Sequence, residues 1–83
     1  MKEVVNRLIK FRDDRNWKQF HTPNNLAKSI AIESSELLIN YQFDNHYFDL
    51  ENVKDELADV MAYCLMLSDH YGFDLEEIMN EKI

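Results

Sequence analysis

Hydrophobic residues recur every three or four positions along most of this chain, which is the pattern of amphipathic α-helices. We therefore expect four helices, at about residues 2–14, 23–41 and 50–71 and from about residue 74 onward. The stretches 16–21 and 42–48 lose the helical period, so they are predicted to be connecting loops. The pattern has no internal repeat and no linker. The chain is thus predicted to be all-α, with a single helical domain over residues 1–83.

Residues that start and stop helices lie at the ends of these stretches. Thr22 is the predicted N-cap of the second helix, and Pro23 takes its first position. Asp49 is the corresponding N-cap of the third helix, which Gly72 is expected to end. Asp74, with a Glu three residues later, resembles a capping box and opens the fourth helix. No cap or breaker follows that helix, so we expect that C-terminal residues of the natural protein are missing here.

Composition narrows the class of protein. One Gly and one Pro in 83 residues are too few for the turns of an all-β fold. Cys64 is the single cysteine, so no intramolecular disulfide can form, and no zinc-type Cys/His spacing occurs. No apolar run approaches the ~20 residues of a membrane span, and the N-terminus lacks a signal-peptide pattern. We expect a cytoplasmic protein that does not bind membranes and that gains stability by oligomerisation.

The charge balance bears on possible partners. The chain has 16 acidic and 9 basic residues, for a net charge of −7. This charge argues against binding to nucleic acid, whose backbone attracts basic surfaces. An acidic protein can still bind an anionic ligand when a divalent cation lies between them.

Two pairs of acidic residues differ from the rest because they flank apolar helix faces. Glu33 and Glu36 are three apart on the second predicted helix, and Glu56 and Asp59 are three apart on the third. Residues at this spacing are neighbours on one helix face. If the two helices pack in antiparallel fashion along their apolar stripes, four carboxylates meet, and a divalent cation would offset their repulsion. An all-oxygen site suits Mg²⁺ or Mn²⁺. From the residues alone, two solvated acidic faces remain the alternative.

The spacing of these pairs also resembles a known family. Glu33-x-x-Glu36 and Glu56-x-x-Asp59, with 19 residues between them, resemble the signature of MazG-like all-α nucleoside triphosphate pyrophosphohydrolases. The upstream stretch from Phe11 to Leu26, with its Arg-Asn-Trp-x-Gln-Phe-His segment, is similar to the single-domain branch. That branch includes the integron-associated MazG proteins and the dCTP pyrophosphatases. The resemblance covers about residues 8–83.

The resemblance implies a fold, a reaction and a metal. The fold is a four-helix-bundle-type arrangement that is completed by oligomerisation, as a homodimer or homotetramer. The reaction converts a (deoxy)nucleoside triphosphate, of the dCTP or dATP type, to a monophosphate and pyrophosphate during house-cleaning of the nucleotide pool. Mg²⁺, or Mn²⁺, would be held by Glu33, Glu36, Glu56 and Asp59, and Glu36 is our choice for the general base.

The resemblance also implies a set of substrate-binding residues. Aromatic rings stack on bases, and a His can add a hydrogen bond. The candidates for the base and sugar are Trp17, His21, Phe43 and Tyr63, and those for the phosphates are Asn25, Lys28 and Lys82. Phe43 stands where the branch commonly has Trp, so stacking there would be weaker. The rival hypothesis is a non-enzymatic acidic helical-bundle module that binds a partner protein.

Overall fold

The chain folds into helices alone over the residues that the structure describes. This structure is a computed structural model that describes residues 1–41 and 49–83. Its elements are α1 (Lys2–Asp14), the 3-10 helix η1 (Lys18–Phe20), α2 (Pro23–Ile39), α3 (Leu50–His70) and α4 (Leu75–Lys82). The predicted all-α class is confirmed.

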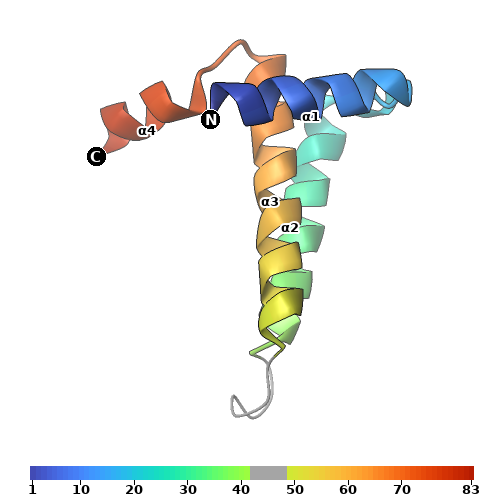
Figure 1. Ribbon diagram of the computed structural model, residues 1–83, viewed down its shortest axis with the longest axis vertical. Helices are drawn as coiled ribbons and strands as arrows, with labels where there is room; N and C mark the ends of the chain where they lie inside the picture. Colours follow the sequence, from blue (N-terminus) through green and yellow to red (C-terminus); the bar gives the residue numbers. More distant parts are fainter. Residues whose placement is uncertain (42–48) are drawn as a thin grey trace.

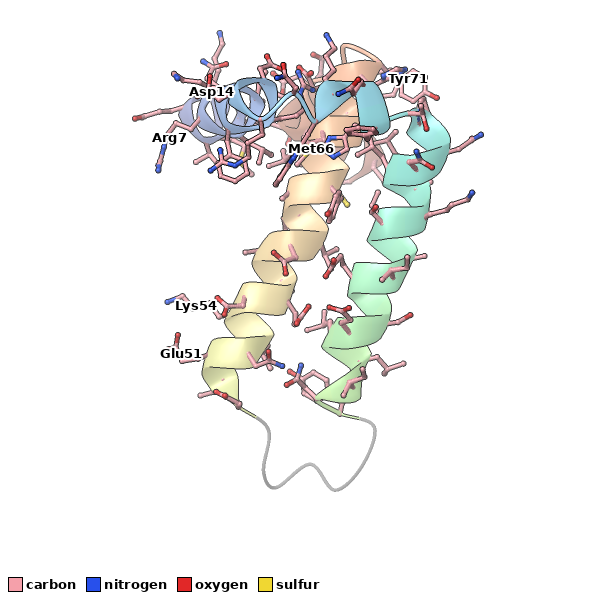
Figure 2. The ribbon with its side chains drawn as sticks, turned by 90° about the vertical axis from the view of Figure 1, so that its right-hand side faces the viewer. Arg7, Asp14, Glu51, Lys54, Met66 and Tyr71 are labelled. Carbon is pink, nitrogen blue, oxygen red and sulfur yellow. The ribbon has the colours of Figure 1, made fainter. Side chains whose placement is uncertain are left out.

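The two long helices form the body of the molecule. Helices α2 and α3 run antiparallel and lie side by side along most of their length, as both views show (Figure 1, Figure 2). Helix α1 crosses this hairpin at the end away from the α2–α3 connection, and α4 extends outward from that same end (Figure 1). No helix in the described part of the chain is long and apolar enough to cross a membrane.

The predicted caps hold the helix ends. The Oγ1 atom of Thr22 accepts a hydrogen bond from the backbone N–H of Asn25 at 3.2 Å, which satisfies one free donor of α2. The carboxylates of Asp49 and Asp74 accept backbone N–H groups in the same way at the starts of α3 and α4. Gly72, which follows α3, has a φ of +71°, a conformation that glycine adopts without strain.

Helix α2 ends slightly earlier than the hydrophobic pattern predicted. The pattern carried this helix to Tyr41, whereas its last helical residue is Ile39 and Asn40 is its C-cap. The side chain of Asn40 explains the end, because its Nδ2 donates to the carbonyl of Leu37 at 3.2 Å. Its Oδ1 accepts a hydrogen bond from Asn52 Nδ2 at 2.9 Å, which joins the C-terminal end of α2 to the first turn of α3.

The buried core lies where α1 crosses the hairpin. Leu26 of α2 and Leu65 and Met66 of α3 are the buried hydrophobic residues of the described part of the chain. The Oγ of Ser68 donates to the carbonyl of Phe73 at 3.0 Å and so fixes the turn after α3. The rest of the hairpin extends from this core as a two-helix arm.

Candidate functional site

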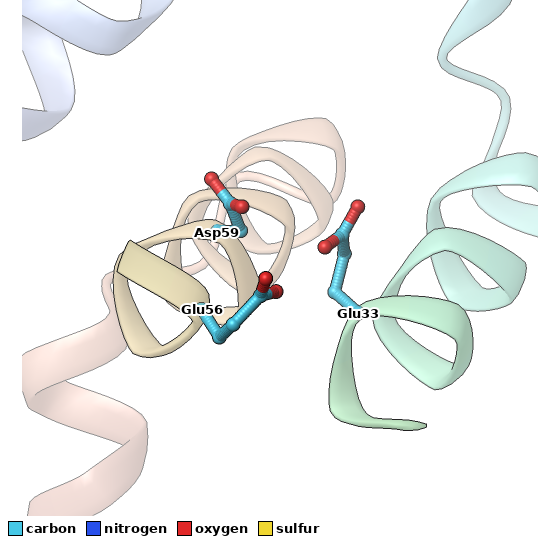
Figure 3. Close-up of side chains that lie close together, drawn as sticks. All are labelled: Glu33, Glu56 and Asp59. Carbon is cyan, nitrogen blue, oxygen red and sulfur yellow. The ribbon is translucent and has the colours of Figure 1, made fainter. Parts of the chain in front are cut away.

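Three carboxylates converge in the middle of the hairpin. Glu33 extends from α2, while Glu56 and Asp59 extend from α3, and the three point toward one another (Figure 3). One oxygen of each lies within 4.8 Å of an oxygen of the other two. The i, i+3 spacing puts Glu56 and Asp59 on one face of α3, and in the structure this face is turned toward Glu33 of α2 (Figure 3).

The electrostatics of this carboxylate cluster are unfavourable without a cation. Glu33 and Glu56 are half-buried, and the Oε2 atom of each is buried with no hydrogen-bond partner. Burial, and then the negative charges of Glu36 and Asp59, raise the pKa of both side chains above the ordinary 4.5. Buried oxygens that lack a partner destabilise a fold unless a ligand satisfies them.

The fourth predicted ligand, Glu36, lies at the rim of the cluster. Its side chain is exposed, and it does not belong to the group whose oxygens lie within 4.8 Å of one another. It is still close enough for its charge to raise the pKa of Glu33 and Glu56. The cluster therefore has three converging ligand candidates and one solvent-facing carboxylate beside them.

The donor set fits one class of metal. Every candidate ligand is a carboxylate oxygen, which is the hard donor that Mg²⁺ and Mn²⁺ prefer. The two unpartnered Oε2 atoms supply the acceptor groups that a cation would satisfy. The residues present therefore fit a hard divalent cation.

A series of rings leads from α1 to the carboxylate cluster. Ring centroids are 5.5 Å apart for Phe11 and Trp17, 6.3 Å for Trp17 and His21, and 6.3 Å for His21 and Tyr63. Tyr63 follows Asp59 by four residues on α3 and so lies one turn from it. Burial, and then the charges of Glu33 and Asp59, raise the pKa of the Tyr63 hydroxyl. Three of the predicted base-binding residues thus belong to one aromatic group.

Exposure and charge differ along this series. Trp17 is 41% exposed, so part of its ring is open to a ligand. His21 is half-buried, and its Nδ1 has no hydrogen-bond partner. Burial, and then the charge of Arg12, lower the pKa of His21, so its imidazole is neutral at pH 7.

The predicted phosphate-binding residues lie apart from the carboxylate cluster. The side-chain amide of Asn25 donates to the carbonyl of Phe20 at 3.0 Å, so it serves the turn before α2. Lys28 is exposed on α2, about 140° around the helix axis from Glu33. Lys82 is exposed on α4, which extends away from the arm (Figure 1). Phe43 lies outside the described residues.

Sequence reasoning missed the role of Arg12. This side chain is only 6% exposed, and it bonds to the carboxylate of Asp13 at 3.0 Å and to that of Asp69 at 3.4 Å. The signal was present, because Arg12 follows Leu8 by four residues and so falls on the apolar stripe of α1.

Comparisons with known proteins agree with the geometry. The chain is 29% identical over 94 residues to dCTP pyrophosphatase 1 of Mus musculus, a match that covers 98% of this chain and 54% of the mouse protein. It therefore spans about half the length of this curated relative. A crystal structure of a pyrophosphatase from Archaeoglobus fulgidus DSM 4304 superposes with a TM-score of 0.87 at 38% identity, over 99% of this chain and 83% of that one. The MazG-like family profile matches residues 26–83, which include all four acidic residues of the double motif. The chain belongs to the MazG-like family.

Proposed function

We propose that the protein is a Mg²⁺-dependent nucleoside triphosphate pyrophosphohydrolase. It would cleave the bond between the α- and β-phosphates, giving a monophosphate and pyrophosphate. The observation that carries the proposal is the convergence of Glu33, Glu56 and Asp59 within 4.8 Å, in a chain of the MazG-like family. The pyrophosphatases to which the chain is similar support the same class of reaction.

Each carboxylate has a role in this reaction. Glu33, Glu56 and Asp59 would hold the cation, which when bound neutralises phosphate charge and orients the triphosphate. Glu36 would accept the proton of the attacking water, because its carboxylate is exposed beside the cluster. A carboxylate at the rim can reach solvent and the bound phosphates at once, whereas the half-buried Glu33 and Glu56 cannot.

The aromatic series would bind the base and sugar. Trp17 offers an open ring face, and the neutral His21 can both donate and accept a hydrogen bond. Of the two expected substrate types, dCTP and dATP, the name of the mouse relative supports dCTP. Tyr63 lies between this group and the carboxylates, where a deoxyribose would lie if the base contacts Trp17. Asn25, Lys28 and Lys82 are weaker candidates, since none lies in the cluster.

The active unit would be a homodimer or a pair of dimers. The accessible surface is 6649 Å², whereas a folded monomer of this mass exposes about 5,200 Å². The arm carries exposed apolar side chains on both helices, including Ile32, Leu38 and Leu57. A second arm packed on this surface would cover them and complete a four-helix bundle.

The compartment follows from the substrate and from the cysteine. Cys64 is a free thiol, which suits a reducing compartment. Nucleoside triphosphates are made and used in the cytoplasm, so we infer that the protein acts there.

Product analysis tests the proposal directly. The protein is incubated with a panel of deoxynucleoside triphosphates, with Mg²⁺ or with EDTA, and the products are separated. We expect monophosphate and pyrophosphate to form only when Mg²⁺ is present. The substrate that is hydrolysed fastest identifies the base preference. Diphosphate and orthophosphate would instead place the attack at the terminal phosphate.

A matched pair of variants localises the chemistry. Glu33→Gln removes one ligand and should lower turnover on the order of 100-fold or more, while the exposed Glu81→Gln on α4 should not change it. Full turnover in Glu33→Gln would overturn the assignment of the cluster. No turnover in the unmodified protein, on any substrate, would favour the partner-binding module instead.

A further inference from the structure

A basic cavity lies at the end of the hairpin where the core is formed. Its volume is about 370 Å³, and Leu26 and Met66 form its apolar wall. Arg12 of α1, Lys18 of η1 and His70 of α3 also line it, together with His21, which it shares with the aromatic series. It is separate from the carboxylate cluster, because Leu26 precedes Glu33 by two helical turns, about 10 Å along α2.

The charge of this basic cavity is opposite to that of the molecule. The chain carries a net charge of −7, yet two of its nine Lys and Arg residues and two of its three His residues line one cavity. Asp69 is the single acidic side chain among the lining residues. Arg12, Lys18 and Asp69 give the lining residues a formal charge of +1, and Asp13, which bonds Arg12 from outside the lining, offsets part of it.

Part of the positive charge of this cavity is buried, because it belongs to the guanidinium of Arg12. The guanidinium is almost fully buried, which is costly unless all its N–H groups are bonded. Its Nε and NH2 atoms share one oxygen of Asp13, and its NH1 reaches Asp69 at the long distance of 3.4 Å. The two carboxylates are 51% and 40% exposed, so water weakens what each contributes. An anion in the cavity would take the donors that these acids leave weakly bonded.

We propose that this basic cavity binds a small phosphate monoester, at a site distinct from the carboxylate cluster. The guanidinium of Arg12 and the ammonium of Lys18 bind the phosphate group, and the imidazole of His70 donates a hydrogen bond to it. The apolar wall of Leu26 and Met66 contacts the carbon skeleton. A cavity of about 370 Å³ is larger than inorganic phosphate requires and accommodates a phosphorylated sugar.

Nuclear magnetic resonance titration of the ¹⁵N-labelled protein tests this site. The probes are ribose 5-phosphate and inorganic phosphate, in EDTA and at constant ionic strength, with ribose as the uncharged control. EDTA removes divalent cations, so phosphate cannot bind through the carboxylate cluster. We expect saturable shifts at Lys18 and His70 with both phosphates, tighter binding of the sugar phosphate, and no shifts with ribose.

Variants separate this site from non-specific charge. Lys18→Ala and His70→Gln should each raise the Kd of ribose 5-phosphate by about fivefold or more. Lys54→Ala removes one exposed lysine of α3 outside the cavity (Figure 2) and should leave the Kd unchanged. Shifts that do not saturate, or equal Kd values in all three variants, would overturn the proposal. Loss of binding in Glu33→Gln would also overturn it, because the phosphate would then lie at the carboxylate cluster. Because no turnover is measured, the result is independent of the hydrolytic activity.

Discussion

At the scale of single residues, Glu33 destabilises the metal-free fold, although it is placed to bind the proposed cation. Its carboxylate is half-buried, its Oε2 has no partner, and three other acidic side chains repel it. The folded protein therefore holds a proton at Glu33 more tightly than the unfolded chain does. A group of this kind loses its contribution to stability as the pH rises from the unfolded pKa through the raised folded pKa.

This linkage predicts how stability depends on pH and on metal. In EDTA, the Tm should fall as the pH rises from about 4.5 toward neutrality, and the fall should be smaller in Glu33→Gln. At pH 7 the metal-free variant should be more stable than the unmodified protein by a few degrees. Mg²⁺ should raise the Tm of the unmodified protein and have little effect on the variant. Thermal denaturation followed by circular dichroism measures all of these changes.

The exposed Glu81→Gln is the control for that series. It removes the same charge from α4, away from the carboxylate cluster of Glu33, Glu56 and Asp59, so its pH profile should follow that of the unmodified protein. If Glu81→Gln and Glu33→Gln gave the same profile, net charge and not the carboxylate cluster would explain the effect.

Arg12 gives a second prediction at the scale of residues. Arg12→Ala should lower the free energy of unfolding by about 2 kcal/mol, because it removes a buried side chain and its charged hydrogen bonds. Asp69→Asn should have a smaller effect, since Asp69 is partly exposed and its hydrogen bond to Arg12 is long. Urea denaturation measures both, and equal losses would contradict this account of Arg12.

At the scale of elements, Gly72 ends α3 and begins the turn to α4. Its φ of +71° lies in the left-handed region, and a Cβ added there would meet no atom within 4 Å. Gly72→Ala should therefore cost about 1 kcal/mol through backbone strain alone, and Gly72→Asn should cost less. A much larger loss in urea denaturation would mean that the side chain meets an atom that this account leaves out.

The elements themselves follow closely from the sequence. The caps at Thr22, Asp49 and Asp74 were predictable because short polar side chains at a helix start have few other roles. The end of α2 was not, since the bonds of Asn40 depend on Asn52 of α3. That carboxylates of the two acidic pairs come together was predictable from their spacing along the helices. The rim position of Glu36 was not, because it depends on how the two helices are rotated against each other.

At the scale of the whole molecule, the arm is larger than the core that supports it. The radius of gyration is 14.3 Å, while a compact domain of this length has about 11.8 Å. Part of the exposed apolar surface lies on the arm, where Ile32, Leu38 and Leu57 face solvent in one copy of the chain. The proposed dimer gives those residues a place to pack.

Dimerisation predicts two measurable effects. The Tm should rise with protein concentration, and sedimentation should give the mass of a dimer or tetramer. Ile32→Asp and Leu57→Asp place a charge on the exposed arm and should shift the protein toward the monomer, with a lower Tm. Val4→Asp, on an exposed position of α1, should leave the mass unchanged. A monomer at all concentrations would contradict the proposed dimer.

The bond between Asn40 and Asn52 has a mechanical consequence. This hydrogen bond holds α2 and α3 together near the α2–α3 connection, and the core around Leu26 holds them together at the opposite end of the hairpin. The carboxylates lie at mid-span between these two fixed points, where the gap between the helices can change most easily. Repulsion would bow the span outward when the site is empty, and a cation would draw it in. A cation bound there would set the gap between the two helices according to its ionic radius, so a small ion would hold them closer together than a large one.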